Sequence, residues 1–198
     1  MKNYERYRLM TPGECKKKGL MYYLCRHFAD KKIFPLINKI KNKKILDVGI
    51  GAGYYSKVLM KKNQIIGLDQ NPHLCNLPLK LIKGDATKIA SLVSNKKMDI
   101  IFSTWMTEYL NEKELVAFFK ESNKVLARNG KLITTIIAPS GFGSIYVFMA
   151  KMIKGINKYT YSEIVICKLL QTCGFNKIKI IPLNGFLMLP WAFLVIAE

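Results

Sequence analysis

Two carboxylates and three glycines in the first half of the chain have types and spacing suited to binding a small molecule. Asp47 lies in an apolar run, and Gly49, Gly51 and Gly53 follow it at alternate positions. Glycines let a backbone turn sharply and approach a ligand closely. Asp69 ends a second apolar run twenty residues after Gly49. A carboxylate placed there can accept hydrogen bonds from both hydroxyls of a ribose.

A strand, a turn and a helix are expected to position these groups. The apolar run predicts a buried strand over residues 44–48, and a helix is expected over 52–62, after the glycines. The free N–H groups and positive dipole end of that helix would favour an anionic group such as a carboxylate. A second strand over 64–68 would place Asp69 at the same edge of the sheet.

The pattern D-x-G-x-G-x-G, with an acidic residue ending the next strand, resembles the cofactor site of class I S-adenosylmethionine-dependent methyltransferases. The alternative is a dinucleotide-binding turn, G-x-G-x-x-G, which also has an acidic residue about twenty positions on. Counted from Gly49, that pattern needs a glycine at position 54, where the chain has Tyr54. A glycine turn that only packs a strand against a helix is a third interpretation.

The resemblance implies a role for each residue of the motif. The glycines would wrap the methionine part of S-adenosylmethionine, and Asp47 would bind its amino group directly or through water. Asp69 would bind the ribose hydroxyls, with Gln70 beside the adenosine. Asp85 and Ala86, which follow a strand expected over 79–83, match the adenine contact of the family. Asp85 could equally be a helix N-cap.

The resemblance also points to the end of the fourth strand, expected over 98–103. Ser103 and Trp105 stand where the family makes cofactor contacts, although Trp105 could also be a core residue. Many small-molecule members have a histidine at the position aligned with Glu108. A carboxylate there could act as a general base or orient the acceptor, or it could be a solvated residue at a helix start. Tyr7 is a second candidate catalytic residue, because N-terminal helices usually cap the acceptor pocket of the family.

Some substrates are disfavoured by motifs that the sequence lacks. No Asp/Asn-Pro-Pro-aromatic motif follows the fourth strand, where Ser103-Thr104-Trp105-Met106 stands. Methylation of adenine N6 or of glutamine is therefore not expected. The Pro-Cys pair needed for 5-methylcytosine formation is also absent.

The order of the expected elements predicts the fold class. Strands alternate with helices along the chain, which is typical of a parallel sheet covered by helices on both faces. Strands expected over 176–182 and 191–197 have no helix between them and resemble the final hairpin of the family. We therefore expect an α/β Rossmann-like methyltransferase fold, with a seven-stranded, mostly parallel sheet and an antiparallel last strand. One domain is expected, with a helical cap over 1–43 and a cofactor-binding core over 44–198.

Two regions outside the core are expected to surround the acceptor. Helices over 12–29 and from about residue 32 to residue 40 would form the cap. The apolar, aromatic segment 142–154, together with 185–190, suggests a hydrophobic lid. Such a lid would suit a hydrophobic acceptor, which a membrane could deliver, or it would simply pack on the core.

Charge and cysteine content bear on partners and location. The formal net charge is +19, and residues 1–44 hold thirteen Lys or Arg against three acidic residues. This balance suits an anionic membrane surface or nucleic acid, although a lysine-rich proteome would give the same composition. Five cysteines at irregular spacing and two histidines predict reduced thiols and no metal site. We expect a cytoplasmic protein, or one peripheral to the inner face of a membrane.

The main hypothesis from the sequence is methyl transfer from S-adenosylmethionine to a small apolar or amphipathic acceptor, such as a lipid or a biosynthetic intermediate. An RNA methyltransferase with a basic N-terminal region is the first alternative. A non-catalytic, cofactor-binding partner subunit is the second. The sequence does not distinguish O-, N- and C-methylation.

Overall fold

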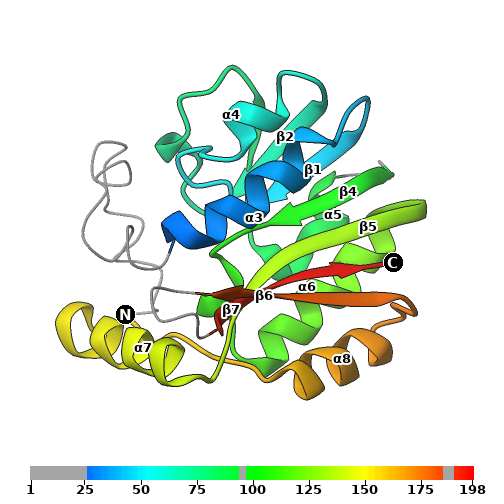
Figure 1. Ribbon diagram of the computed structural model, residues 1–198. Helices are drawn as coiled ribbons and strands as arrows, with labels where there is room; N and C mark the ends of the chain where they lie inside the picture. Colours follow the sequence, from blue (N-terminus) through cyan, green and yellow to red (C-terminus); the bar gives the residue numbers. More distant parts are fainter. Residues whose placement is uncertain (1–25, 94–96, 185–189) are drawn as a thin grey trace.

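The computed structural model describes residues 26–93, 97–184 and 190–198. A seven-stranded sheet runs through them in the order β3-β2-β1-β4-β5-β7-β6 (Figure 1). Neighbouring strands are parallel except that β7 runs antiparallel to both β5 and β6. The strands are β1 Lys44–Val48, β2 Gln64–Asp69, β3 Lys80–Lys83, β4 Met98–Ser103, β5 Leu126–Ile137, β6 Ile178–Asn184 and β7 Pro190–Ala197. The expected fold class is confirmed.

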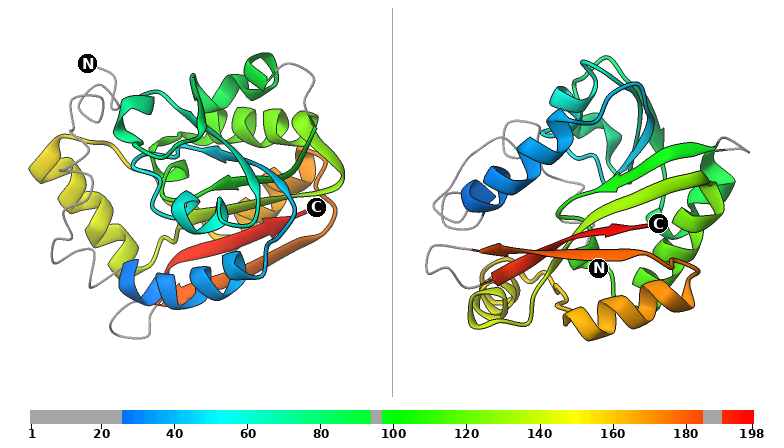
Figure 2. Two further views of the ribbon diagram at one scale, coloured as in Figure 1. Left: turned by 90° about the horizontal axis from the view of Figure 1, so that it is seen from above. Right: turned by 45° about the vertical axis from the view of Figure 1, so that its right-hand side comes forward.

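Helices cover both faces of this sheet (Figure 2). The α-helices are α3 His27–Asn38, α4 Ser56–Leu59, α5 Ile89–Val93, α6 Glu112–Val125, α7 Gly141–Lys154 and α8 Glu163–Thr172. Three 3-10 turns, η2 Pro72–Leu74, η3 Ala86–Lys88 and η4 Thr107–Tyr109, follow the carboxyl ends of β2, β3 and β4. In the right-hand view of Figure 2, α3 lies on one side of the sheet and α6 and α8 lie on the other.

Side-chain alternation along the strands divides the core into two parts. Ile45 of β1 packs with Ile33 and Ile37 of α3 on one face of the sheet. Its neighbour Leu46 points to the other face, where it packs in the cluster that contains Phe118 of α6. Successive residues of a strand point to opposite faces, so a sheet covered on both sides needs apolar residues at nearly every position. This explains why the strands read as continuous apolar runs.

Local hydrogen bonds fix the start of α6. The Oδ1 atom of Asn111 accepts from the N–H of Glu114 at 3.0 Å, and Oε2 of Glu114 accepts from the N–H of Asn111 at 2.9 Å. This capping box satisfies two backbone donors that a helix end would otherwise leave without partners. The helix therefore begins at Glu112, close to the start of the helix that the sequence predicts over 111–126.

The N-terminal helices differ from the expectation. The helix expected over 12–29 lies almost entirely outside the described residues, and α3 continues through positions 29–32, where two separate helices were predicted. Buried Ala29, Ile33 and Ile37 are spaced four apart, so they form one stripe that faces the sheet along the whole of α3. Pro35 is tolerated inside this helix at an exposed position.

Two further boundaries differ as well. The helix predicted over 52–62 is limited to α4, because Gly53 to Tyr55 are still part of the loop. Strand β5 begins at Leu126, directly after α6, whereas the sequence predicts a strand over 131–137. None of the described helices has both the length and the apolar composition to cross a membrane.

Candidate functional site

The loop after β1 has a backbone conformation that requires glycine. Gly49 and Gly53 both have φ near +74°, a region that residues with a Cβ rarely adopt. A Cβ on Gly49 would lie 2.5 Å from Cγ of Met106, and one on Gly53 would lie 2.5 Å from Cδ1 of Leu77. The glycines thus form a narrow turn, and side chains from the loops after β4 and after β2 pack closely against it.

Asp69 at the end of β2 is tied to this loop. Its Oδ2 accepts from the N–H of Gly51 at 2.9 Å, and its Oδ1 accepts from the N–H of Asn71 at 2.7 Å. Burial raises the pKa of Asp69, and the backbone donors of Asn71 and Gly51 oppose that rise. A carboxylate has about four lone-pair positions, so Asp69 keeps acceptor capacity for the hydroxyls of a ligand.

Asp47 lies beneath the same loop. It is buried, and the hydroxyl of Ser56 donates to its Oδ2 at 2.6 Å. Burial raises the pKa of Asp47 to about 7, against the effect of the Ser56 hydrogen bond, and the charge of Asp69 adds to the rise. Two carboxylates therefore lie close enough to interact at the carboxyl ends of β1 and β2. A cationic ligand group would stabilise the ionised form of Asp47.

Asp85 and Ala86 lie beside Asp69, at the end of β3. The N–H of Gly84 donates to the backbone oxygen of Asp69 at 3.0 Å, which holds the two strand ends together. Asp85 caps η3, since its Oδ1 accepts from the N–H and the hydroxyl of Thr87. The N-cap role is present in the structure, and the carboxylate still has free lone pairs for an exocyclic amine. Gln70, between Asp69 and Asn71, is partly exposed at this edge.

Ser103 and Trp105 follow the end of β4, the strand next to β1. The hydroxyl of Ser103 donates to the backbone oxygen of Val48 at 2.9 Å and so joins the ends of β4 and β1. Trp105 has a φ of +59°, which is unusual for a bulky residue. Its N–H donates to Oγ1 of Thr135 at 2.8 Å, and its ring stacks on Trp191 with centroids 4.8 Å apart. Surrounding contacts therefore hold Trp105 in a strained conformation, a feature that often marks functional sites.

One interpretation of the sequence placed Glu108 in solvent at a helix start. The structure shows that this residue is buried instead. Its side chain is 2% exposed and forms an ion pair with Lys158, and its Oε1 also accepts from the hydroxyl of Tyr146. Burial is the largest single effect on the pKa of Lys158 and lowers it, but Glu108, together with Tyr109 and Tyr146, raises the pKa overall. The ammonium group therefore stays charged and holds the carboxylate in place. Tyr7, the second catalytic candidate, lies outside the described residues.

Four residues in the cluster around Glu108 and Trp105 were not named as site residues from the sequence, although Arg26 lies in the expected cap and Tyr146 in the expected lid. Arg26 precedes α3, Tyr55 precedes α4, Tyr146 is on α7, and Lys158 follows α7. The guanidinium of Arg26 lies 5.1 Å from the ring centroid of Trp105, and Nε1 of Trp105 donates to the hydroxyl of Tyr55 at 3.2 Å. Lys158 and Tyr146 are 50 and 38 residues from Glu108 in the chain. No spacing rule links positions so far apart.

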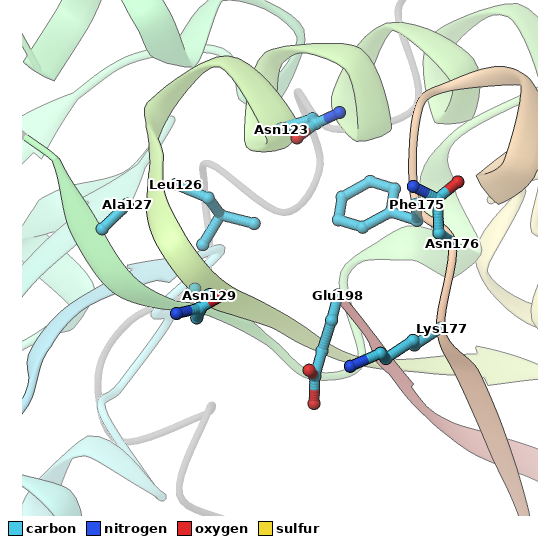
Figure 3. A pocket seen from close by; sticks show the side chains of 9 residues that line it. Asn123, Leu126, Ala127, Asn129, Phe175, Asn176, Lys177 and Glu198 are labelled. Atoms are coloured by element: carbon cyan, nitrogen blue, oxygen red, sulfur yellow. The ribbon is translucent and has the colours of Figure 1, made fainter.

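A separate pocket lies at the opposite edge of the sheet (Figure 3). It has a volume of about 260 Å³ and lies between the start of β5, the start of β6 and the C-terminal residue Glu198. It shares no residue with the glycine loop or with the Glu108 cluster. Within the described ranges, no group of three or more His, Cys, Asp or Glu side chains could hold a metal ion.

Comparisons with known proteins agree with this geometry. Residues 46–134 match the family model described as a methyltransferase domain. The chain is 29% identical over 109 residues to ubiquinone biosynthesis O-methyltransferase from Pelagibacter ubique, covering 51% of this chain and 45% of that protein. It is 28% identical over 116 residues to malonyl-[acyl-carrier protein] O-methyltransferase from Legionella pneumophila, covering 52% and 39%. The chain thus spans less than half the length of these curated relatives.

Solved structures share this fold. The structure of a DhpI-SAM-HEP complex superposes with a TM-score of 0.74 at 11% identity, covering 99% of this chain and 96% of that one. Over residues 46–134 the chain matches a methyltransferase domain, and its fold is that of the S-adenosylmethionine-dependent methyltransferase family. S-adenosylmethionine is the cofactor of this family, and the residues present fit it: a turn that only glycine can form, with a buried carboxylate on either side of it.

Proposed function

We propose that this protein transfers the methyl group of S-adenosylmethionine to a small apolar or amphipathic acceptor, such as a lipid or a biosynthetic intermediate. The observation that carries this proposal is the hydrogen bond from the Gly51 N–H to Asp69, which joins the glycine loop to the second carboxylate. In open α/β sheets, ligands bind beyond the carboxyl ends of the strands, where both groups lie.

Each residue of the site would then have a defined part in binding. The three glycines would surround the methionine portion, with the Asp47 carboxylate facing the amino group. Asp69 would accept from the ribose hydroxyls, and Asp85 from the exocyclic amine of the adenine. Ser103 and Trp105 would line the cofactor on the β4 side. The bound cofactor supplies a sulfonium methyl group, and the protein then has to align an acceptor with the methyl–sulfur bond.

The exposed side chains of helix α7 support the proposal that the acceptor is amphipathic. Ile145, Phe148, Met149 and Met152 are exposed large apolar side chains, with exposed fractions of 43% to 68%. Their spacing of three, four and seven residues places them on one face of the helix. An apolar helix face beside basic residues suits the surface of an anionic bilayer, and the net charge of +19 would strengthen that attraction. Both relatives described above are named as O-methyltransferases, one of ubiquinone biosynthesis and one of malonyl-[acyl-carrier protein].

The test is conversion of S-adenosylmethionine to S-adenosylhomocysteine with small amphipathic acceptors, offered with and without anionic vesicles. Turnover by the wild type, lost in Asp47→Ala, is the expected result. If only RNA supports turnover, and its binding weakens steeply with added salt, the protein is an RNA methyltransferase instead. If the cofactor binds but turnover appears only when a second protein is added, the chain is a partner subunit.

A further inference from the structure

Glu108 has one carboxylate oxygen without a hydrogen-bond partner. Its Oε1 accepts from Tyr146 and pairs with Lys158, but no donor within the described residues reaches its Oε2. The residue is 2% exposed, so bulk water does not satisfy this atom. A buried acceptor of this kind costs free energy unless a donor reaches it. We expect a ligand group to supply the donor.

Within the described residues, Arg26 has hydrogen-bond donors without acceptors, whereas Glu108 has an acceptor without a donor. Its guanidinium lies over the ring of Trp105 and forms no hydrogen bond or ion pair within the described part of the chain. Stacking uses the face of a guanidinium and leaves its in-plane N–H groups available. Trp105, the ring under Arg26, stacks on Trp191. Trp191 contacts the ring of Tyr146, whose hydroxyl donates to Glu108. Arg26 and Glu108 therefore belong to one cluster of side chains. The nearby Asp30 is already bonded to the hydroxyls of Tyr54 and Tyr55.

The two unmet demands favour a neutral ligand group that can both donate and accept a hydrogen bond. A carboxylate or phosphate would accept from Arg26 but would face the Glu108 oxygen with like charge. An ammonium group would donate to Glu108 but would face Arg26 with like charge and has no lone pair to offer. An ether can accept but cannot donate. A neutral hydroxyl can donate its proton to Glu108 and accept from Arg26 at the same time.

We propose that a hydroxyl of the methyl acceptor binds between Arg26 and Oε2 of Glu108 and that its oxygen is the atom methylated. This inference rests on the proposed function and narrows it to O-methylation. An oxygen lone pair forms the new bond to the methyl carbon, and the methyl–sulfur bond breaks with its electron pair remaining on sulfur. The hydroxyl proton passes to Glu108. Arg26 stabilises the negative charge that develops on the oxygen, while Lys158 and Tyr146 position Glu108.

The test uses four probes of the same shape and the fluorescence of Trp105 and Trp191, the two tryptophans of the chain. Protein saturated with S-adenosylhomocysteine is titrated with cyclohexanol, cyclohexyl methyl ether, cyclohexylamine and cyclohexanecarboxylate. Cyclohexanol should bind most tightly. Arg26→Met and Glu108→Gln should each weaken its binding about tenfold, the usual effect of losing a hydrogen bond to a charged group.

Two variants keep the result interpretable. Lys31→Met removes a charge from an exposed position on α3, the helix that Arg26 precedes, and should leave cyclohexanol binding unchanged. Arg26→Met leaves the Glu108–Lys158 pair intact, so its result stands even if Glu108→Gln fails to fold. Equal or tighter binding of the ether, amine or carboxylate would overturn the proposal. Wild-type-like affinity in Arg26→Met, or no saturable response to cyclohexanol, would overturn it too. Failure of S-adenosylhomocysteine to bind would instead overturn the proposed function.

Discussion

The backbone N–H of Gly51 donates to Oδ2 of Asp69 at 2.9 Å, so one hydrogen bond links the glycine loop to the end of the neighbouring strand. The two groups stand 18 residues apart in the chain, and the parallel pairing of β1 with β2 brings them together. This hydrogen bond fixes the position of the Asp69 carboxylate relative to the glycine loop. The cofactor site would therefore already have its shape before a ligand binds.

Changing Asp69 to Asn should weaken binding of S-adenosylmethionine about tenfold or more. The amide keeps one acceptor oxygen, but its NH2 group would face one of the two backbone donors, Gly51 or Asn71, and would disturb the loop. Titration calorimetry measures the change. Asp99→Asn is the matched control, because Asp99 accepts from the N–H of Lys44 at the opposite ends of the strands. Equal losses in the two variants would mean that Asp69 has only a structural role.

Replacing Gly53 by Ala should destabilise the protein by roughly 1 to 3 kcal/mol, since a residue with a Cβ is strained at a φ of +74°. The new methyl group would also meet Leu77 and Cys75. Urea unfolding checks this value. Gly141→Ala serves as the control, because a Cβ at this first position of α7 meets nothing within 4 Å and alanine favours a helix. A Gly53 variant as stable as the Gly141 variant would contradict the account of the loop.

Asp47 should make the stability of the free protein depend on pH. Its pKa is about 7 in the folded state, whereas an unfolded aspartate has a pKa of about 4. Between these values the folded state holds the extra proton. The free energy of unfolding should therefore be highest below about pH 4 and fall as the pH rises through about 7.

The variant Asp47→Asn should lose this dependence and should exceed the wild type in stability above about pH 7, by an amount on the order of a few kcal/mol. Urea unfolding without cofactor, repeated over a pH series, measures the difference between the two proteins. A difference that stays constant across the series would show that Asp47 ionises normally in the folded state.

Breaking the buried ion pair between Glu108 and Lys158 should be costly. Lys158→Met leaves the Glu108 carboxylate without its ammonium partner in a buried position, and a loss of about 3 kcal/mol is expected. The double change Glu108→Leu with Lys158→Met should recover most of this loss, because no partial pair is left. Lys124→Met, which removes the exposed partner of Glu121, should cost less than about 1 kcal/mol. Similar losses in the two single variants would argue against a buried pair.

The elements that carry the cofactor site could be predicted because their signals are local. Buried parallel strands read as apolar runs, and Asp47, the glycines and Asp69 stand at or directly beyond the ends of such runs. The predicted length of helix α4 was wrong, because the hydrophobic pattern does not indicate where the preceding loop ends. Two helices were also predicted where α3 is one continuous helix, although Ala29, Ile33 and Ile37 are evenly spaced four residues apart.

The acceptor side could be predicted only in part. The position of Glu108 after the fourth strand marked it as a candidate, but its burial and its pairing with Lys158 depend on where the segment after α7 crosses the end of the sheet. The stacking of Trp105 on Trp191 likewise joins the end of β4 to the start of β7, far apart in the chain. Such contacts follow from the tertiary fold and leave no periodic pattern in the sequence.

Binding of the cofactor itself tests the central claim most directly. Calorimetric titration of the wild type with S-adenosylmethionine, S-adenosylhomocysteine and NAD compares the two ligand classes that a glycine turn of this kind could serve. The site predicts saturable binding of both sulfur compounds and no response to NAD. Binding of NAD without the sulfur compounds would contradict the account.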